Sequence, residues 1–312
     1  MGKEKLVVLI GPTAVGKTNL SIQLAKKLNA EIISGDSMQV YRTMDIGTAK
    51  ITVDEMQGVP HHLIDIKDPE EDFSVAEFQE MVRELIGEIH KRNKMPMIVG
   101  GTGLYIQSVL YDYHFTEEAS DGLFRKQMEE LYLEKGIDPL YNKLKMIDPE
   151  AMKRIHPNNV RRVIRALEIY HVTGKTMTEY LSKQKQDLYY DDALIGLTMD
   201  RTTLYNRINR RVDLMIQNGL IQEVRELFEK GVKDCQSIQA IGYKELYHYF
   251  EGKIDLDTAI EQLKQNSRRY SKRQLTWFRN KMNVKWFDMT PPVNELEKVN
   301  EIFTYTAGKL ES

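Results

Sequence analysis

This chain of 312 residues contains little cysteine, has no long apolar run and carries little net charge. It has one cysteine, Cys235, which excludes an internal disulfide and a zinc site of the Cys-x-x-Cys type. The apolar run at residues 6–10 is too short for a secretory signal, and no run reaches the 18 residues of a membrane span. We therefore expect a cytoplasmic protein that does not enter a membrane.

The overall composition is that of an ordinary globular protein. The chain is 41% hydrophobic and 29% charged, with a net charge of −2. Nothing in this balance marks it globally as a partner of nucleic acid or of a membrane surface. Its length predicts about two domains.

The most informative stretch starts with the apolar run at residues 6–10, which has the length of a strand. The next eight residues fit the pattern G-x-x-x-x-G-K-[ST], and leucines then recur at every fourth position from 20 to 28, as on one face of a helix. Strand, glycine loop and helix together predict a phosphate-binding loop, or P-loop, whose N–H groups surround an anion. Lys17 is expected at the terminal phosphate and the Thr18 hydroxyl at Mg²⁺. The loop consists of Gly11, Pro12, Thr13, Ala14, Val15, Gly16, Lys17 and Thr18.

Two further short apolar runs, 31–34 and 97–99, are predicted to be parallel strands that end at the same edge of a sheet. Ligands bind at that edge in α/β proteins. Asp36 follows the first of these strands. It is interpreted as a general base, as a magnesium ligand, or simply as a turn or N-cap aspartate. Gly100-Gly101-Thr102-Gly103 follows the second, either as a ligand-facing loop or as a tight turn.

Residues 61–66 are interpreted as another short strand or the edge of one. The paired His61 and His62 suggest a metal, but no third ligand has suitable spacing. A structural role is the favoured interpretation.

From Asp121 to about Lys185 no strand-like run occurs, and helical spacing dominates. Asp-Pro and His-Pro pairs separate the predicted helices, the last of which covers residues 158–172. Strand character returns at Ala193–Leu197. The sequence therefore predicts an α/β protein whose sheet is interrupted by a helical insertion.

Basic residues gather in two places. Arg207, Arg210 and Arg211 lie on a predicted helix, where they form either a solvated face or an anion site suited to a diphosphate. The stretch Lys264–Lys285 carries eight basic and no acidic residues, so the rest of the chain has a charge of −10. This segregation, with interleaved aromatic residues, favours contact with looped or single-stranded nucleic acid, although a basic surface helix with its aromatics in the core is the alternative.

Taken together, these motifs resemble the tRNA dimethylallyltransferase, or isopentenyl-transferase, family. The resemblance covers nearly the whole chain in the family's order. Five stretches carry it: Gly11–Thr18, Asp36–Tyr41, Gly100–Tyr105, His156–Glu168 and Gln239–Glu245. The P-loop alone occurs in many proteins, whereas its combination with Asp-Ser-Met-Gln-Val-Tyr is specific.

The resemblance implies transfer of a dimethylallyl group from dimethylallyl diphosphate to the exocyclic amine of the adenosine 3′ of the anticodon in tRNA. Diphosphate leaves, with Mg²⁺ as the cofactor. It also implies that Asp36 is the general base, that Thr13 contacts the donor's bridging region, and that Arg207 binds the diphosphate. The implied partner is the tRNA anticodon stem-loop, and we expect a monomer.

The implied fold is a P-loop NTPase-like parallel-sheet core, 1–115 and 187–312, with an all-helical insertion, 116–186, that grips the anticodon stem-loop. The target adenosine would leave the stacked loop to reach the donor. The implied tRNA-binding residues are Asp36, Ser37, Met38, Gln39, Thr102, Arg125, Asn159, Val160, Arg161, Arg162 and Val163.

Two other functions fit part of the sequence. A P-loop kinase of a nucleoside or other small metabolite would use Asp36 to activate a hydroxyl and the region 121–185 as a lid, but it has no need of the basic stretch near the C-terminus. A non-catalytic RNA-binding ATPase would leave Asp36 without a role.

Overall fold

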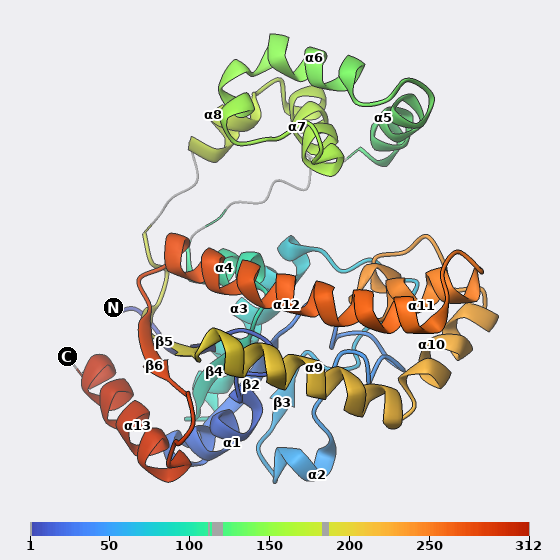
Figure 1. The fold of residues 1–312 in the computed structure, drawn as a ribbon. Coiled ribbons are helices and arrows are strands. Elements are labelled where there is room, and N and C mark those ends of the chain that lie inside the picture. Colours follow the sequence, from blue (N-terminus) through green and yellow to red (C-terminus); the bar gives the residue numbers. More distant parts are fainter. Residues whose placement is uncertain (1, 112, 114–120, 183–186, 312) are drawn as a thin grey trace. The chain divides into compact units, whose positions relative to one another are not determined.

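The computed structural model describes residues 2–111, 113, 121–182 and 187–311. The chain forms two compact units, one comprising Met1–Leu110 with Leu188–Ser312 and the other Tyr111–Asp187 (Figure 1). The predicted domain boundary at residues 115 and 116 lies outside the described residues. Each unit is described below by itself.

The first unit is built on a six-stranded, fully parallel sheet with the order β3-β2-β4-β1-β5-β6. This confirms the predicted α/β class. Strands β1, β2, β4 and β5 are buried almost throughout, because helices cover both faces of such a sheet. The strands are β1 (Lys5–Ile10), β2 (Ala30–Gly35), β3 (His61–His62), β4 (Met95–Gly100), β5 (Asp191–Thr198) and β6 (Lys285–Asp288).

Strand β3 is shorter than predicted. Only His61 and His62 pair with β2, and the predicted continuation to residue 66 is wrong. Leu63 and Asp65 have φ angles of 61° and 55°, a left-handed conformation that a strand cannot contain. The Glu31 carboxylate accepts a hydrogen bond from His62 Nε2 at 2.8 Å, which agrees with the structural interpretation of this histidine.

Helices α1 (Lys17–Leu28) and α13 (Glu295–Glu311) cover one face of the sheet, and α3 (Val75–Lys91) and α4 (Gly103–Leu110) cover the other (Figure 1). Alternate residues of a strand point to opposite faces. Val7 and Leu9 accordingly share one core with Leu20 of α1 and Ile302 of α13. The predicted leucine stripe after the P-loop is therefore a core-facing stripe.

The remaining helices of this unit are α2 (Val53–Met56), α9 (Arg201–Gln217), α10 (Leu220–Glu229), η3 (Ser237–Gln239), α11 (Tyr243–Phe250) and α12 (Leu256–Lys281). Asp200 caps α9 by accepting a hydrogen bond from the Thr203 N–H at 2.9 Å. Helices α9 and α12 run side by side (Figure 1). They carry the two groups of basic residues recognised in the sequence.

The described elements of the second unit are all helices: α5 (Gly122–Lys135), α6 (Asp138–Ile147), η2 (Pro149–Lys153), α7 (Val160–Thr173) and α8 (Met177–Ser182). Their apolar faces meet in a separate core that includes Phe124, Leu144 and Leu167. No helix among the described residues of either unit is both long and apolar enough to cross a membrane.

Candidate active site at the carboxyl edge of the sheet

The P-loop connects β1 to α1 at the carboxyl edge of the sheet. Its backbone is left-handed at Ala14, with φ of 64°, and at Gly16, with φ of 105°. Such alternation turns successive N–H groups toward one point, and glycine adopts it without steric cost. The loop thus has the shape of an anion cradle, as the sequence predicts.

Lys17 is folded back over this loop. Its Nζ donates hydrogen bonds to the carbonyl oxygens of Gly11 and Pro12, both at 2.8 Å. Burial and, to a smaller extent, the nearby Arg211 lower the pKa of Lys17 to about 7, although Asp36 opposes the shift. A bound anion would favour the charged form of this amine.

The P-loop lines a first cavity of about 560 Å³. Arg207, Arg210 and Arg211 of α9 line the same cavity, where Arg207 and Arg210 are exposed and Arg211 is half-buried. Burial lowers the pKa of Arg211, and the Asp36 carboxylate acts against this. The spacing of Arg207, Arg210 and Arg211 in the sequence already offered an anion site, whereas the family resemblance implied Arg207 alone as the diphosphate ligand.

Asp36 follows β2 and lies in the wall of the first cavity. Its Oδ1 accepts a hydrogen bond from the Met38 N–H at 2.9 Å, which agrees with the interpretation of Asp36 as a turn residue. Oδ2 has no hydrogen bond to any residue in the described ranges. One carboxylate oxygen therefore holds the turn while the other is left for a ligand.

A second cavity of about 290 Å³ shares part of its wall with the first. Both are lined by Thr13, Asp36, Thr48, Arg211 and Tyr270. The rest of the second cavity's wall includes the apolar side chains Ile208, Val212, Met215, Leu220 and Leu263, together with Ser37, Met38, Gly47, the segment 239–242, Ser267 and Arg273. Asp36 thus stands where a strongly basic cavity meets a mainly apolar one.

Gln274 of α12 ties two edge loops together. Its Oε1 accepts from the Thr13 N–H and its Nε2 donates to the Gly101 carbonyl, each at 3.0 Å. A side chain on Gly101 would collide with Gln274, since a Cβ there would lie 2.2 Å from Nε2. The glycine-rich loop therefore both lines the first cavity and packs closely against α12. No local pattern in the sequence marks Gln274.

Two predicted tRNA-binding side chains make contacts inside the first unit. Thr102 Oγ1 accepts from the Ser37 N–H at 3.2 Å, which fixes the start of the 36–39 segment. Gln39 is turned inward: Nε2 donates to the carbonyls of Thr48 and Ala49 at 3.3 and 3.4 Å, and Oε1 accepts from Ser34. In this arrangement the half-buried Gln39 side chain supports a loop and also lines the first cavity.

The basic stretch 264–285 lies mostly on α12, and its side chains divide into two sets. Lys264 pairs with Asp213 at 2.8 Å, Arg268 donates to Asn209, and Arg279 stacks on Trp286. Phe278 belongs to the core. The other set borders a surface hollow of about 530 Å³ beside Trp277: Arg269, Lys272, Arg273 and Lys281. This second set lines one hollow and is called the cationic face of α12 below.

In the second unit, Glu168 of α7 is fully buried and binds Arg125 and Arg165, each at 2.9 Å. Burial alone would raise the pKa of Glu168, but hydrogen bonds from Arg165, from the Asp121 N–H and from Arg125 outweigh it and lower the pKa. Arg125, a predicted tRNA ligand, is thereby fixed by its partner.

The predicted tRNA-binding segment 159–163 forms the start of α7. Asn159 caps the helix through the Arg162 N–H, and Arg161 and Arg162 are exposed. Val160 is half-buried, and Val163 is fully buried in the core of this unit. Of the five, Asn159 and the two arginines are exposed on the surface.

The metal predicted at Thr18 has no dedicated protein cage. Among the described residues, no group of three or more His, Cys, Asp or Glu side chains could hold a metal ion. Thr18 lines the first cavity, so its hydroxyl fits a magnesium ion that is bound mainly by substrate phosphates and water.

This combination defines a P-loop enzyme core in which an anion cradle adjoins a second, mainly apolar cavity across one carboxylate. The family model described as IPP transferase matches residues 39–281. The tRNA dimethylallyltransferase of Bacillus subtilis (strain 168) is 68% identical over 99% of this chain and 98% of its own length. That of Bacillus cytotoxicus is also 68% identical, over 99% and 96%.

Solved structures that resemble this chain point to the same family. The tRNA isopentenylpyrophosphate transferase of Bacillus halodurans is 57% identical over 99% of this chain and 97% of its own, with a TM-score of 0.76. A eukaryotic dimethylallyltransferase, described as acting on tRNA, is 35% identical over 92% and 74%, with a TM-score of 0.78. The chain belongs to the IPP transferase family. It is a transferase, and the small-molecule kinase alternative is not favoured.

Proposed function

We propose that the chain transfers a dimethylallyl group from dimethylallyl diphosphate to the N6 amine of the adenosine next to the anticodon, on its 3′ side, in tRNA. The names of its relatives support the reaction class. The observation that carries the residue-level proposal is the position of Asp36 in the wall shared by the two cavities. A group transfer between two dissimilar substrates requires such a meeting point.

The first cavity is the proposed donor site. The N–H groups of the P-loop, Lys17, Arg207 and Arg211 supply positive charge to the diphosphate. This charge matters most as the bond from carbon to the bridging oxygen breaks and negative charge grows on the leaving group. Thr13 lies at the boundary of the two cavities, which suits contact with that bridging region.

Mg²⁺ would be held by the Thr18 hydroxyl and by the donor's own phosphate oxygens. When bound, it supplies further neutralisation of the leaving diphosphate. The chain's contribution at this point is to place Thr18 at the first turn of α1, directly after Lys17.

The second cavity is the proposed acceptor site. The adenine leaves its stack and enters beside Ser37 and Met38, so that its N6 amine faces Asp36. The amine nitrogen bonds to the donor carbon, the carbon–oxygen bond breaks, and Asp36 accepts the amine proton through its free Oδ2. The cationic face of α12 and the exposed Arg161 and Arg162 of the second unit are the proposed contacts to the RNA backbone.

The test is to incubate the protein with Mg²⁺ and an unmodified anticodon stem-loop, offering dimethylallyl diphosphate or ATP in separate reactions, and to weigh the RNA. We expect a gain of one dimethylallyl group with the prenyl donor only. A stem-loop with guanosine in place of the target adenosine is the matched control and should gain nothing. No gain on the adenosine substrate, together with phosphate release from ATP, would overturn the proposal.

A further inference from the structure

The loop of residues 45–49 is a wall that the two cavities have in common. Thr48 borders both cavities, Gly47 borders the second and Ala49 the first. No residue of this loop belongs to the P-loop or to the catalytic residues proposed above. Its position nevertheless sets the shape of the space in which donor and acceptor meet.

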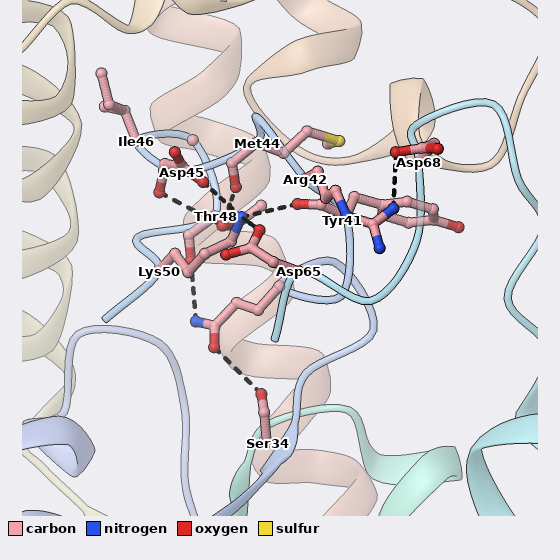
Figure 2. Close-up of polar contacts among 12 residues, drawn as sticks. Ser34, Tyr41, Arg42, Met44, Asp45, Ile46, Thr48, Lys50, Asp65 and Asp68 are labelled. Carbon is pink, nitrogen blue, oxygen red and sulfur yellow. Dashed lines mark hydrogen bonds and ion pairs between the residues drawn. The ribbon is translucent and has the colours of Figure 1, made fainter. Parts of the chain in front are cut away.

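One side of the 45–49 loop is anchored within its own part of the chain. Figure 2 shows Lys50 at the centre of this anchor, between the Tyr41 carbonyl and the carboxylates of Asp45 and Asp65. The Lys50 side chain is only 5% exposed, whereas its partners Asp45 and Asp65 are 62% and 48% exposed. Gln39 adds bonds to the loop carbonyls, as described above.

The other side of the loop is held by a single carboxylate from α10. Glu223 Oε2 accepts from the N–H groups of Asp45 and Ile46, at 2.9 and 2.7 Å, and Oε1 accepts from that of Gly47 at 3.0 Å. Three successive N–H groups that converge on one anion form an anion-binding nest. Here the anion is part of the protein.

Tyr243 also binds Glu223, and these two side chains are called the clamp of the 45–49 loop below. Tyr243 is fully buried, and its hydroxyl donates to Glu223 Oε1 at 2.6 Å. Its ring lies against Gly47 so closely that a Cβ at that position would be 2.5 Å from Cε2. Glycine at position 47 is therefore required for the ring to reach Glu223. Tyr243 belongs to the stretch Gln239–Glu245, whose role the sequence left unassigned.

We infer that Glu223 is a positioning residue, which fixes the 45–49 loop against α10 and thereby aligns the acceptor base with the donor. This inference rests on the proposed function. Helix α10 follows α9 directly through Gly219, and α9 carries the arginines of the first cavity. The clamp thus links the wall of the acceptor cavity to the helix that binds the diphosphate.

Only a carboxylate serves all four donors at once, because each of its oxygens accepts two hydrogen bonds and donates none. Glu223→Gln keeps one acceptor oxygen and turns an N–H donor toward at least one donor of the loop. Glu223→Ala leaves the three loop N–H groups without the acceptor. Tyr243→Phe removes one of the four hydrogen bonds and keeps the ring against Gly47.

The experiment measures single-turnover dimethylallyl transfer at saturating donor and stem-loop RNA. Each rate is divided by the concentration of donor-binding sites, obtained by titration with dimethylallyl diphosphate. Glu226→Gln is the matched control, since Glu226 lies one turn further along α10, is exposed and accepts a hydrogen bond from Gln222.

We expect Glu223→Ala to lower the rate per site about tenfold or more, because a displacement of about 1 Å can cost up to a hundredfold. Glu223→Gln should fall between Ala and wild type, Tyr243→Phe should lose less than Glu223→Gln, and donor affinity should stay unchanged. Should Glu223→Ala fail to fold, Glu223→Gln and Tyr243→Phe still decide the matter.

A merely structural carboxylate would reduce the number of donor-binding sites and leave the rate per site at the wild-type value. That result would overturn the inference. It differs from failure of the proposed function, in which the wild-type protein itself transfers no dimethylallyl group to the RNA.

Discussion

Replacing Asp36 by Asn tests the centre of the proposed mechanism with little disturbance of the fold. Asn has the same shape, and its Oδ1 keeps the hydrogen bond from the Met38 N–H at 2.9 Å, so the turn after β2 should persist. What disappears is the capacity to accept a proton at the other oxygen. A positioned general base contributes about 10²–10⁴ in rate.

We therefore expect Asp36→Asn to slow single-turnover transfer at least about a hundredfold, which corresponds to about 2.7 kcal/mol of transition-state stabilisation. Stem-loop affinity should change little, because the cationic face of α12 and the second unit are untouched. The substitution also removes a charge that raises the pKa of Lys17. Donor binding must consequently be saturated in every assay, so that weaker binding is not read as slower chemistry.

The matched control is Asp54→Asn, which removes a carboxylate from the exposed first turn of α2, away from both cavities. It should transfer at the wild-type rate. The reasoning is refuted if Asp36→Asn reacts at a rate close to that of wild type once both substrates are saturating. If instead stem-loop binding collapses while saturated chemistry survives, Asp36 recognises the acceptor and does not deprotonate it.

Two further predictions follow from the charged groups around the cavities. The pKa of Lys17, about 7 in the free protein, is raised when the diphosphate binds, so binding takes up a proton above pH 7. Donor affinity measured by titration should therefore fall as pH rises from 7 to about 9, by up to about one log unit per pH unit. The Lys17→Met variant should bind the donor more weakly and lose this pH dependence. A flat wild-type profile would contradict the assignment. Removing Arg269 and Lys272 together should flatten the salt dependence of stem-loop binding by about 1.4 log–log units, at about 0.7 per phosphate contact. The control variant Arg268→Gln should leave the slope unchanged, because Arg268 is already bonded to Asn209. Equal slopes for all three proteins would exclude the α12 face from the RNA interface.

The identity of the P-loop could be predicted from sequence because its properties are local. A strand, eight loop residues and a helix are contiguous, and the backbone conformation at Gly16 depends on the residues on either side. Asp36 could be placed at the same edge without side-chain contacts, since parallel strands end together. The α/β class followed from the same apolar runs. The predicted length of β3 was wrong, because two residues with positive φ end the strand earlier.

Tertiary structure alone decided which side chains of a group face the site. Periodicity put Arg268 and Arg269 on the same basic helix, but only the packing of α9 against α12 engages the first and leaves the second on the cationic face. In the same way Gln39 follows Met38 directly, yet it turns inward because loop carbonyls lie within its reach.

Gln274 and Glu223 lie beyond prediction from a single sequence for a related physical reason. Gln274 bonds a loop 261 positions away, and Glu223 bonds one 178 positions away. Such contacts leave no spacing pattern, because hydrogen bonding depends on distance in space and the fold alone sets that distance for remote segments. The sequence by itself determined the chemistry of the phosphate cradle and the candidate base. The folded chain decided that the base stands between two cavities and which residues hold their walls in place.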